Sequence, residues 1–182
     1  MLISRLKSLQ QNVSGNPAPT LFVAWTSHMS VEVKLLDNDH KKLLILLSEL
    51  HDGATSNCMP QILEMTFETL LQTLRAHFAH EEQLFTETAF PGAAAHEREH
   101  DHLIQRFRVL QARLRNCSDQ EASLEIITLL KNCIFNHIEY SDQEYVPHLN
   151  AITAGAILTA REVQPHALPR KQAIGLRIQQ GA

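Results

Sequence analysis

A histidine and a glutamate lie four residues apart in the sequence, as His77 and Glu81. On an α-helix this spacing turns through about 400°, so both side chains leave the same face one turn apart. Apolar Leu74, Phe78 and Phe85 flank the pair, which indicates that this face points into a protein core. Glutamate is rarely buried unless it is paired or coordinated. The pair therefore has the types and spacing of two metal ligands, although on its own such a pair is more often solvated.

Four further histidines and one aspartate extend this pattern along the chain. His96 and His100 repeat the four-residue spacing, His40 opens an apolar run, and His137 and Asp142 follow another apolar run. Each set falls in a different helical segment, so the core of one bundle could collect all of them. If these seven residues lay on the surface, their matching types and spacings would all have to be coincidental.

Five histidines and two carboxylates are too many ligands for one metal ion and a natural number for two. If both carboxylates bridge two ions, two histidines remain for one ion and three for the other. With an oxo or hydroxo bridge derived from solvent, one ion is five-coordinate and has an open position. Imidazole and carboxylate ligands suit Fe, Zn or Mn. The vacancy favours a di-iron site with oxygen chemistry over a closed structural zinc site.

The spacing of His137 and Asp142 does not suit a regular helix. Five residues rotate through about 500°, which leaves the two side chains about 140° apart. Ser141, at the favourable spacing of four, is a poor iron ligand. If His137 and Asp142 both coordinate, we predict a π-bulge or local widening between them, a feature frequent at functional sites.

The elements that must position these residues are long helices. Leucine is abundant while glycine and aromatic residues are few, which is typical of an all-α domain. Short loops between long helices predict an up-down-up-down four-helix bundle. We expect helices over about 38–51 with Asp37 as N-cap, about 60–88, about 93–116 and about 120–146.

The chain divides into three predicted pieces. Residues 1–20 form an N-terminal extension, residues 21–150 the bundle, and residues 151–182 a loosely structured C-terminal tail. The bundle begins with an irregular arm that carries Trp25. The tail mixes basic with apolar residues and could dock on a protein partner; it carries Arg161, Leu168, Arg170, Lys171, Ile174, Leu176, Arg177 and Ile178.

Composition excludes several classes of protein. The 182 residues carry a formal net charge of −4, which gives no indication of binding to nucleic acid or to a membrane surface.

The cysteines indicate the redox compartment. Cys58, Cys117 and Cys133 lack CxxC spacing and leave one thiol unpaired in any disulfide scheme, so a reducing compartment is the simpler interpretation. Residues 145–160 are uncharged but too short and too polar to span a bilayer. No signal peptide is indicated. We expect a cytoplasmic protein.

These motifs together resemble the hemerythrin-domain family, of the bacteriohemerythrin type. The matching pieces cover about residues 22–149 and occupy every ligand position of that family. They are Trp25, Val33, Leu36-Asp37-x-x-His40, His77-Phe78-x-x-Glu81-Glu82, Phe90-Pro91-x4-His96-x3-His100, His137-Ile138-x3-Asp142 and Tyr145-Val146-Pro147.

The resemblance implies roles for individual residues. His40 and His77 would hold the iron that takes up O2, and His96, His100 and His137 the other iron. Glu81 and Asp142 would bridge the two. Apolar residues near the ligands would wall a dry O2 pocket; they are Trp25, Leu43, Phe78, Ile134 and Ile138. At Cys133 the family often carries tryptophan, a difference that bears on the size of this pocket.

The other glutamates and histidines near the motifs are not expected to bind metal directly. Glu82, Glu97, Glu99 and Glu139 are expected as surface charges or as partners of the ligands. The remaining histidines (His28, His51, His80, His102, His148 and His166) are expected to be solvated or capping.

By the same resemblance, the expected function is reversible O2 binding by a carrier, store or delivery protein that is not an enzyme. One alternative is an O2 or redox sensor that signals through its tails. Another is a di-iron oxidase or peroxidase, which the changed residue at Cys133 would favour.

Overall fold

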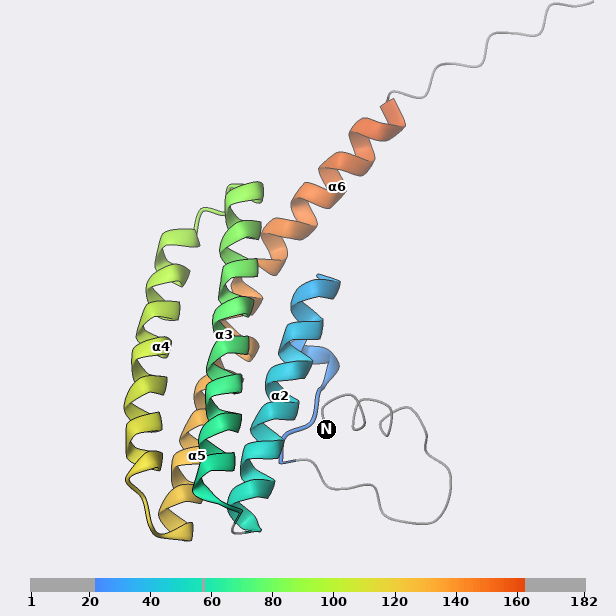
Figure 1. Ribbon diagram of the computed structural model, residues 1–182. Coiled ribbons are helices and arrows are strands. Elements are labelled where there is room, and N and C mark those ends of the chain that lie inside the picture. The colour runs from blue at the N-terminus through green and yellow to red at the C-terminus, as the bar shows by residue number, and fades with distance from the viewer. Residues whose placement is uncertain (1–21, 57, 163–182) are drawn as a thin grey trace, which may run out of the picture.

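The computed structural model describes residues 22–56 and 58–162, and within them an all-helical chain. Four helices lie antiparallel to their neighbours and form the predicted four-helix bundle (Figure 1). They are α2 (Lys34–Thr55), α3 (Pro60–Thr88), α4 (Ala93–Arg115) and α5 (Gln120–Asn136). A 3₁₀ turn, η1 (Ser27–Met29), precedes them, and η2 (His137–Ser141), η3 (Asp142–Glu144) and α6 (Val146–Glu162) follow. The predicted fold class is confirmed.

The first helix differs from its prediction at both ends. It begins at Lys34, so Asp37 lies within the first turn and the predicted N-cap is wrong. The carboxylate of Asp37 accepts hydrogen bonds from Ser30 Oγ at 2.7 Å and from the backbone N–H of Val31 at 2.9 Å. Asp37 thus fixes the incoming arm against α2 instead of capping the helix. The helix also continues past the predicted end at residue 51 to Thr55.

Two apolar clusters occupy the interior at different levels along the bundle. The larger includes Leu43 and Leu74, and the smaller includes Leu36, Phe85 and Tyr145. Along α2, His40 lies between Leu36 and Leu43; along α3, Glu81 lies between Leu74 and Phe85. The candidate ligands His40 and Glu81 therefore lie where the two apolar clusters meet. Polar groups placed there are shielded from water on both sides.

The final helix, α6, leaves the end of the bundle and projects away from it (Figure 1). Val146 and Leu149 pack against the smaller apolar cluster, whereas residues 151–155 are exposed. The prediction of a loosely structured tail is wrong for residues 151–162, which are helical. The predicted extension over residues 1–20, and the tail beyond residue 162, lie outside the described residues. No helix in the described part is long and apolar enough to cross a membrane.

The left-handed residue at the C-terminal cap of α3 can be tested by substitution. Ala89 adopts a left-handed conformation with φ 51° and ψ 46°, which glycine tolerates better than any residue with a Cβ atom. Ala89→Gly should therefore raise the free energy of unfolding by about 1 kcal/mol. Urea denaturation measures this change. Ala112→Gly, at an exposed position inside α4, should instead lower stability by about 1 kcal/mol, and destabilisation by both would contradict the assigned cap.

Candidate metal centre

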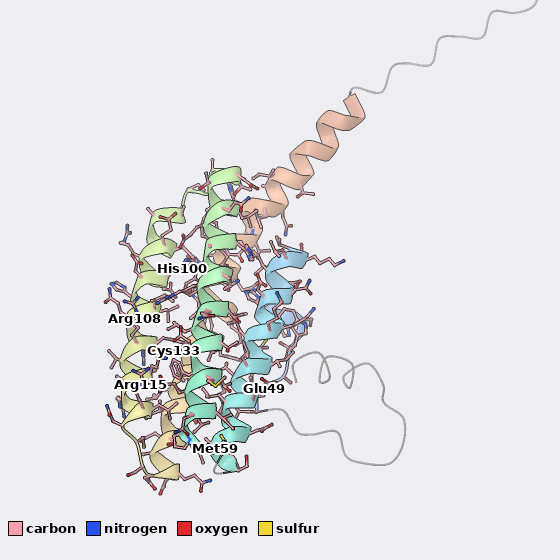
Figure 2. The ribbon with its side chains drawn as sticks, viewed as in Figure 1. Glu49, Met59, His100, Arg108, Arg115 and Cys133 are labelled. Carbon is pink, nitrogen blue, oxygen red and sulfur yellow. The ribbon has the colours of Figure 1, made fainter. Side chains whose placement is uncertain are left out.

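The structure brings all seven predicted ligand residues into one buried cluster. They come from every part of the bundle: His40 on α2, His77 and Glu81 on α3, His96 and His100 on α4, His137 on η2 and Asp142 on η3. His100, labelled in Figure 2, lies in the half of the bundle from which α6 emerges, whereas Met59 marks the opposite end. The cluster is thus placed toward the α6 end.

Two groups within this cluster could each hold a metal ion. One consists of His40, His77, Glu81 and Asp142, and the other of Glu81, His96, His100 and His137. In each group the ligand atoms all lie within 4.8 Å of one another. The sequence predicted two histidines on one side and three on the other, and the structure places the histidines in these two sets.

The carboxylate of Asp142 faces both groups. Its Oδ2 atom lies 3.1 Å from Nε2 of His40 and 3.9 Å from Nε2 of His77. Its Oδ1 atom lies 3.1 Å from Nε2 of His137 and 3.4 Å from Nε2 of His96. One oxygen is therefore available to each group, as a shared carboxylate ligand requires.

Glu81 serves both groups with a single oxygen. Its Oε2 atom lies 3.1 Å from Nε2 of His100 and 3.4 Å from Nε2 of His77. The other oxygen, Oε1, accepts a 2.8 Å hydrogen bond from the Tyr145 hydroxyl. Burial and the two nearby carboxylates, those of Glu81 and Asp142, raise the pKa of Tyr145, so its hydroxyl remains a donor. Tyr145 thereby fixes how Glu81 presents its carboxylate.

The inward-facing atoms of the cluster lack hydrogen-bond partners within the described part of the chain. These are Nε2 of His40, His77, His96, His100 and His137, Oε2 of Glu81 and both carboxylate oxygens of Asp142. Leaving so many buried polar atoms unpaired is energetically costly. Imidazole nitrogens with carboxylate oxygens form the donor set that Fe, Zn and Mn accept. The residues therefore fit a pair of metal ions.

Hydrogen bonds from the outer nitrogens orient three of the imidazoles. His40 Nδ1 donates to the backbone oxygen of Met29 at 3.2 Å, His100 Nδ1 to Glu82 Oε1 at 3.0 Å, and His137 Nδ1 to Glu99 Oε1 at 3.0 Å. Such bonds fix the ring and its tautomer so that Nε2 points inward. The sequence had left Glu82 and Glu99 open as surface charges or partners, and the structure makes both partners.

Ionisation of the cluster depends strongly on its carboxylates. Burial alone would lower the pKa of His96, but the facing Asp142 and Glu81 raise it to about 9. Burial would likewise lower the pKa of His137, but Asp142, Glu81 and Glu99 raise it to about 10. Both values exceed the ordinary 6.5. In the metal-free protein these protonated rings stabilise the fold fully below pH 6.5, and that contribution disappears as the pH rises through about 9 to 10.

Metal uptake should therefore release protons at pH 8. Metal-bound imidazole must be neutral, whereas His96 and His137 still carry their protons in the metal-free protein at that pH. We expect the two rings to contribute roughly two protons per chain, in addition to those released by a solvent-derived bridge between the ions; pH-stat titration with ferrous ions under argon measures the total. Release should fall by about one proton per chain in His96→Gln. Uptake without proton release at pH 8 would contradict the protonated state assigned to these rings.

The predicted local widening between His137 and Asp142 is confirmed. Residues His137–Ser141 form a π-helical turn, and Asp142–Glu144 continue as a 3₁₀ turn. The extra residue in the π-turn brings Asp142 to the same side as His137, where Oδ1 and Nε2 lie 3.1 Å apart. The two irregular turns thus solve the spacing problem seen in the sequence.

An apolar void borders the cluster beside His77 and His137, and it leaves no room for a water molecule. Of the predicted pocket residues, Leu43, Ile134 and Ile138 line it, whereas Trp25, Phe78 and Cys133 are not among its lining residues. Sequence reasoning missed three others: Leu74, Leu103 and Phe107.

The three predicted pocket residues that do not line the void have other surroundings. The ring centroids of Trp25 and His40 lie 6.2 Å apart, and the Lys41 ammonium group lies over the Trp25 ring. The Phe78 ring stacks on His100 with centroids 3.7 Å apart. Cys133 is buried in the larger apolar cluster, and this burial raises the pKa of its thiol.

Comparison with known proteins agrees with this geometry. The model of the hemerythrin HHE cation binding domain matches residues 31–149. A bacteriohemerythrin of Stenotrophomonas maltophilia is 33% identical over 129 residues, 71% of this chain and 82% of that protein. One of Pseudomonas aeruginosa is 30% identical over 124 residues, 68% of this chain and 79% of that protein. A crystal structure of wild-type hemerythrin matches the fold with a TM-score of 0.61 and 24% identity, over 70% of this chain and 98% of that one. The chain belongs to the hemerythrin family.

Proposed function

We propose that this bundle binds O2 reversibly at a non-haem di-iron centre and acts as an oxygen carrier, store or delivery protein. The observation that carries this proposal is the set of inward-facing nitrogen and oxygen atoms that lie buried without hydrogen-bond partners among the described residues. Two bound ferrous ions would supply the two electrons that reversible O2 binding requires. Membership in the hemerythrin family supports the same function.

We assign His40 and His77 to one iron and His96, His100 and His137 to the other. Glu81 and Asp142 are shared, because each lies within reach of both groups. The iron with only two histidines has a position left for O2. The apolar void borders His77 of this group and also His137 of the other, so the choice of ion rests on its smaller number of histidines.

The surrounding residues would protect the bound gas rather than react with it. Leu43, Leu74 and Ile138 make the void apolar; it has no room for water, nor for O2, which is larger, so these side chains would have to shift when O2 binds. Water and protons favour irreversible oxidation of such a centre, so their exclusion serves reversible binding. This arrangement supports binding over turnover, and we propose no enzymatic activity.

An absorption titration from anaerobic to aerobic solution tests the proposal. The iron-loaded, reduced protein should gain a charge-transfer band on addition of O2 and lose it again when O2 is removed by argon. A band that forms and persists after deoxygenation would contradict reversible binding. Sustained turnover of peroxide with a reductant would instead favour an oxidase or peroxidase.

A sensor is the second candidate, and the position of α6 is the observation that favours it. This helix begins at Val146, four residues after Asp142, and projects from the bundle (Figure 1). Tyr145, which binds Glu81, lies directly between the cluster and the helix. Changes at the centre could therefore move α6. Deletion of residues 151–182 separates the two functions: a carrier should keep its O2 affinity and its biological role, whereas a sensor should keep only the affinity.

A further inference from the structure

One carboxylate oxygen on α4 accepts two hydrogen bonds from the irregular segment that follows α5. Glu99 Oε1 lies 3.0 Å from Nδ1 of His137 and 2.7 Å from Oγ of Ser141. These two donors are the first and last residues of the π-turn η2. The Glu99 side chain is 42% exposed, so the bonds form at the rim of the cluster and not in its centre.

The π-turn is not the conformation that this segment would prefer on its own. In a regular α-helix the side chain of residue 141 would follow that of His137 on nearly the same face, and residue 142 would point about 140° away. Asp142 would then leave the buried cluster. π-helical turns are rare and occur mostly as single turns inside α-helices. A contact from outside the segment is therefore needed to favour the π-turn over the regular helix.

We infer that Glu99 is a positioning residue that locks the register of this π-turn. Its bond to Nδ1 directs Nε2 of His137 inward, and its bond to Oγ holds Ser141 on the outer side. With Ser141 held outside, Asp142 is the residue that enters the cluster, and its Oδ1 lies 3.1 Å from Nε2 of His137. Glu99 is hydrogen-bonded to His137 and Ser141, and it acts on the shared ligand Asp142 through the backbone register between these two donors.

The hydrogen bonds from Glu99 hold the π-turn whether or not iron is bound, but their effect on iron binding rests on the proposed function. Two measurements keep them apart. Amide hydrogen exchange over residues 137–142 reports whether the turn is held, and iron per chain reports whether Asp142 remains in place. Unsubstituted protein that binds no iron would overturn the proposed function. The exchange comparison would still show whether Glu99 holds the π-turn.

The test compares Glu99→Ala, Glu99→Gln and the matched control Glu97→Ala. Glu97 lies on the same helix and is exposed. In Glu99→Ala, exchange over residues 137–142 should accelerate about tenfold or more, because hydrogen bonds to a charged acceptor are lost. Iron per chain should fall in the same variant. Glu99→Gln keeps an acceptor oxygen at the same reach and should restore most of the protection. Glu97→Ala should leave both quantities unchanged.

Two results would overturn the inference. One is unchanged exchange over residues 137–142 in Glu99→Ala. The other is equal acceleration along the whole of α5 in this variant, which would indicate general loosening of the bundle instead of a lost register. Ser141→Ala provides a further arm, because it removes one of the two bonds and leaves the other. It should accelerate exchange less than Glu99→Ala does.

Discussion

Replacement of Asp142 by alanine should abolish stable binding of the iron pair. Its two oxygens face different histidine groups, each at 3.1 Å from the nearest Nε2 atom. No other side chain of the cluster offers two such oxygens, because Oε1 of Glu81 is engaged by Tyr145. Without Asp142, each ion of the proposed pair would lose a ligand and the negative charge that compensates it. Iron should fall from about two per chain to less than about one, since metal binding depends on ligand number and geometry.

Iron per chain is measured by elemental analysis after reconstitution under argon and removal of free metal. Glu144→Ala is the matched control, because Glu144 lies in the same 3₁₀ turn and is exposed. It should retain the full iron content. Full iron content in Asp142→Ala would contradict the shared-ligand assignment. A single tightly held zinc in unsubstituted protein grown with ample iron would contradict the di-iron proposal as a whole.

The sequence was most informative where spacing is tied to local geometry. Spacings of four in two helices predicted which side chains share a face, and all seven candidate ligands lie in one buried cluster. The spacing of five between His137 and Asp142 was informative because it does not fit a helix, and it predicted the π-turn. Pro60 marked the start of α3 correctly, since proline suits the first helical turn.

Features that depend on packing between distant segments could not be read from the sequence. The early start of α2 depends on an arm whose Ser30 and Val31 bind Asp37. The lining of the void includes Leu103 and Phe107 of α4, which come near His77 only when the helices pack. Tyr145 carried one usable signal, because a buried tyrosine hydroxyl needs a partner and this one lies three residues after Asp142.

Phe78→Ser should sharply shorten the lifetime of the oxygenated protein. Phe78 stacks on His100 with an interplanar angle of 5°, and its ring centroid lies 5.2 Å from that of His137. On its other side it lines a surface groove of about 250 Å³ between α3 and α4, together with Arg75 and Arg108. His100 lines the same groove, so Phe78 lies between the solvent there and the inner side of the cluster, including His137. A serine would let water from the groove reach the centre, and irreversible oxidation should accelerate by about tenfold or more, equivalent to 1.4 kcal/mol in activation free energy.

Stopped-flow mixing with O2, followed by decay of the charge-transfer band, measures this lifetime. Truncation of a buried phenylalanine also costs about 3–5 kcal/mol of stability, so folding must be checked by circular dichroism. Phe78→Leu keeps an apolar plug and should decay only slightly faster than the unsubstituted protein. Ile104→Ser is the matched control, because Ile104 lines the same groove but has no aromatic ring to stack on the histidines as Phe78 does. If Phe78→Ser is folded, holds its iron and decays no faster than Ile104→Ser, Phe78 is not the barrier between solvent and the centre.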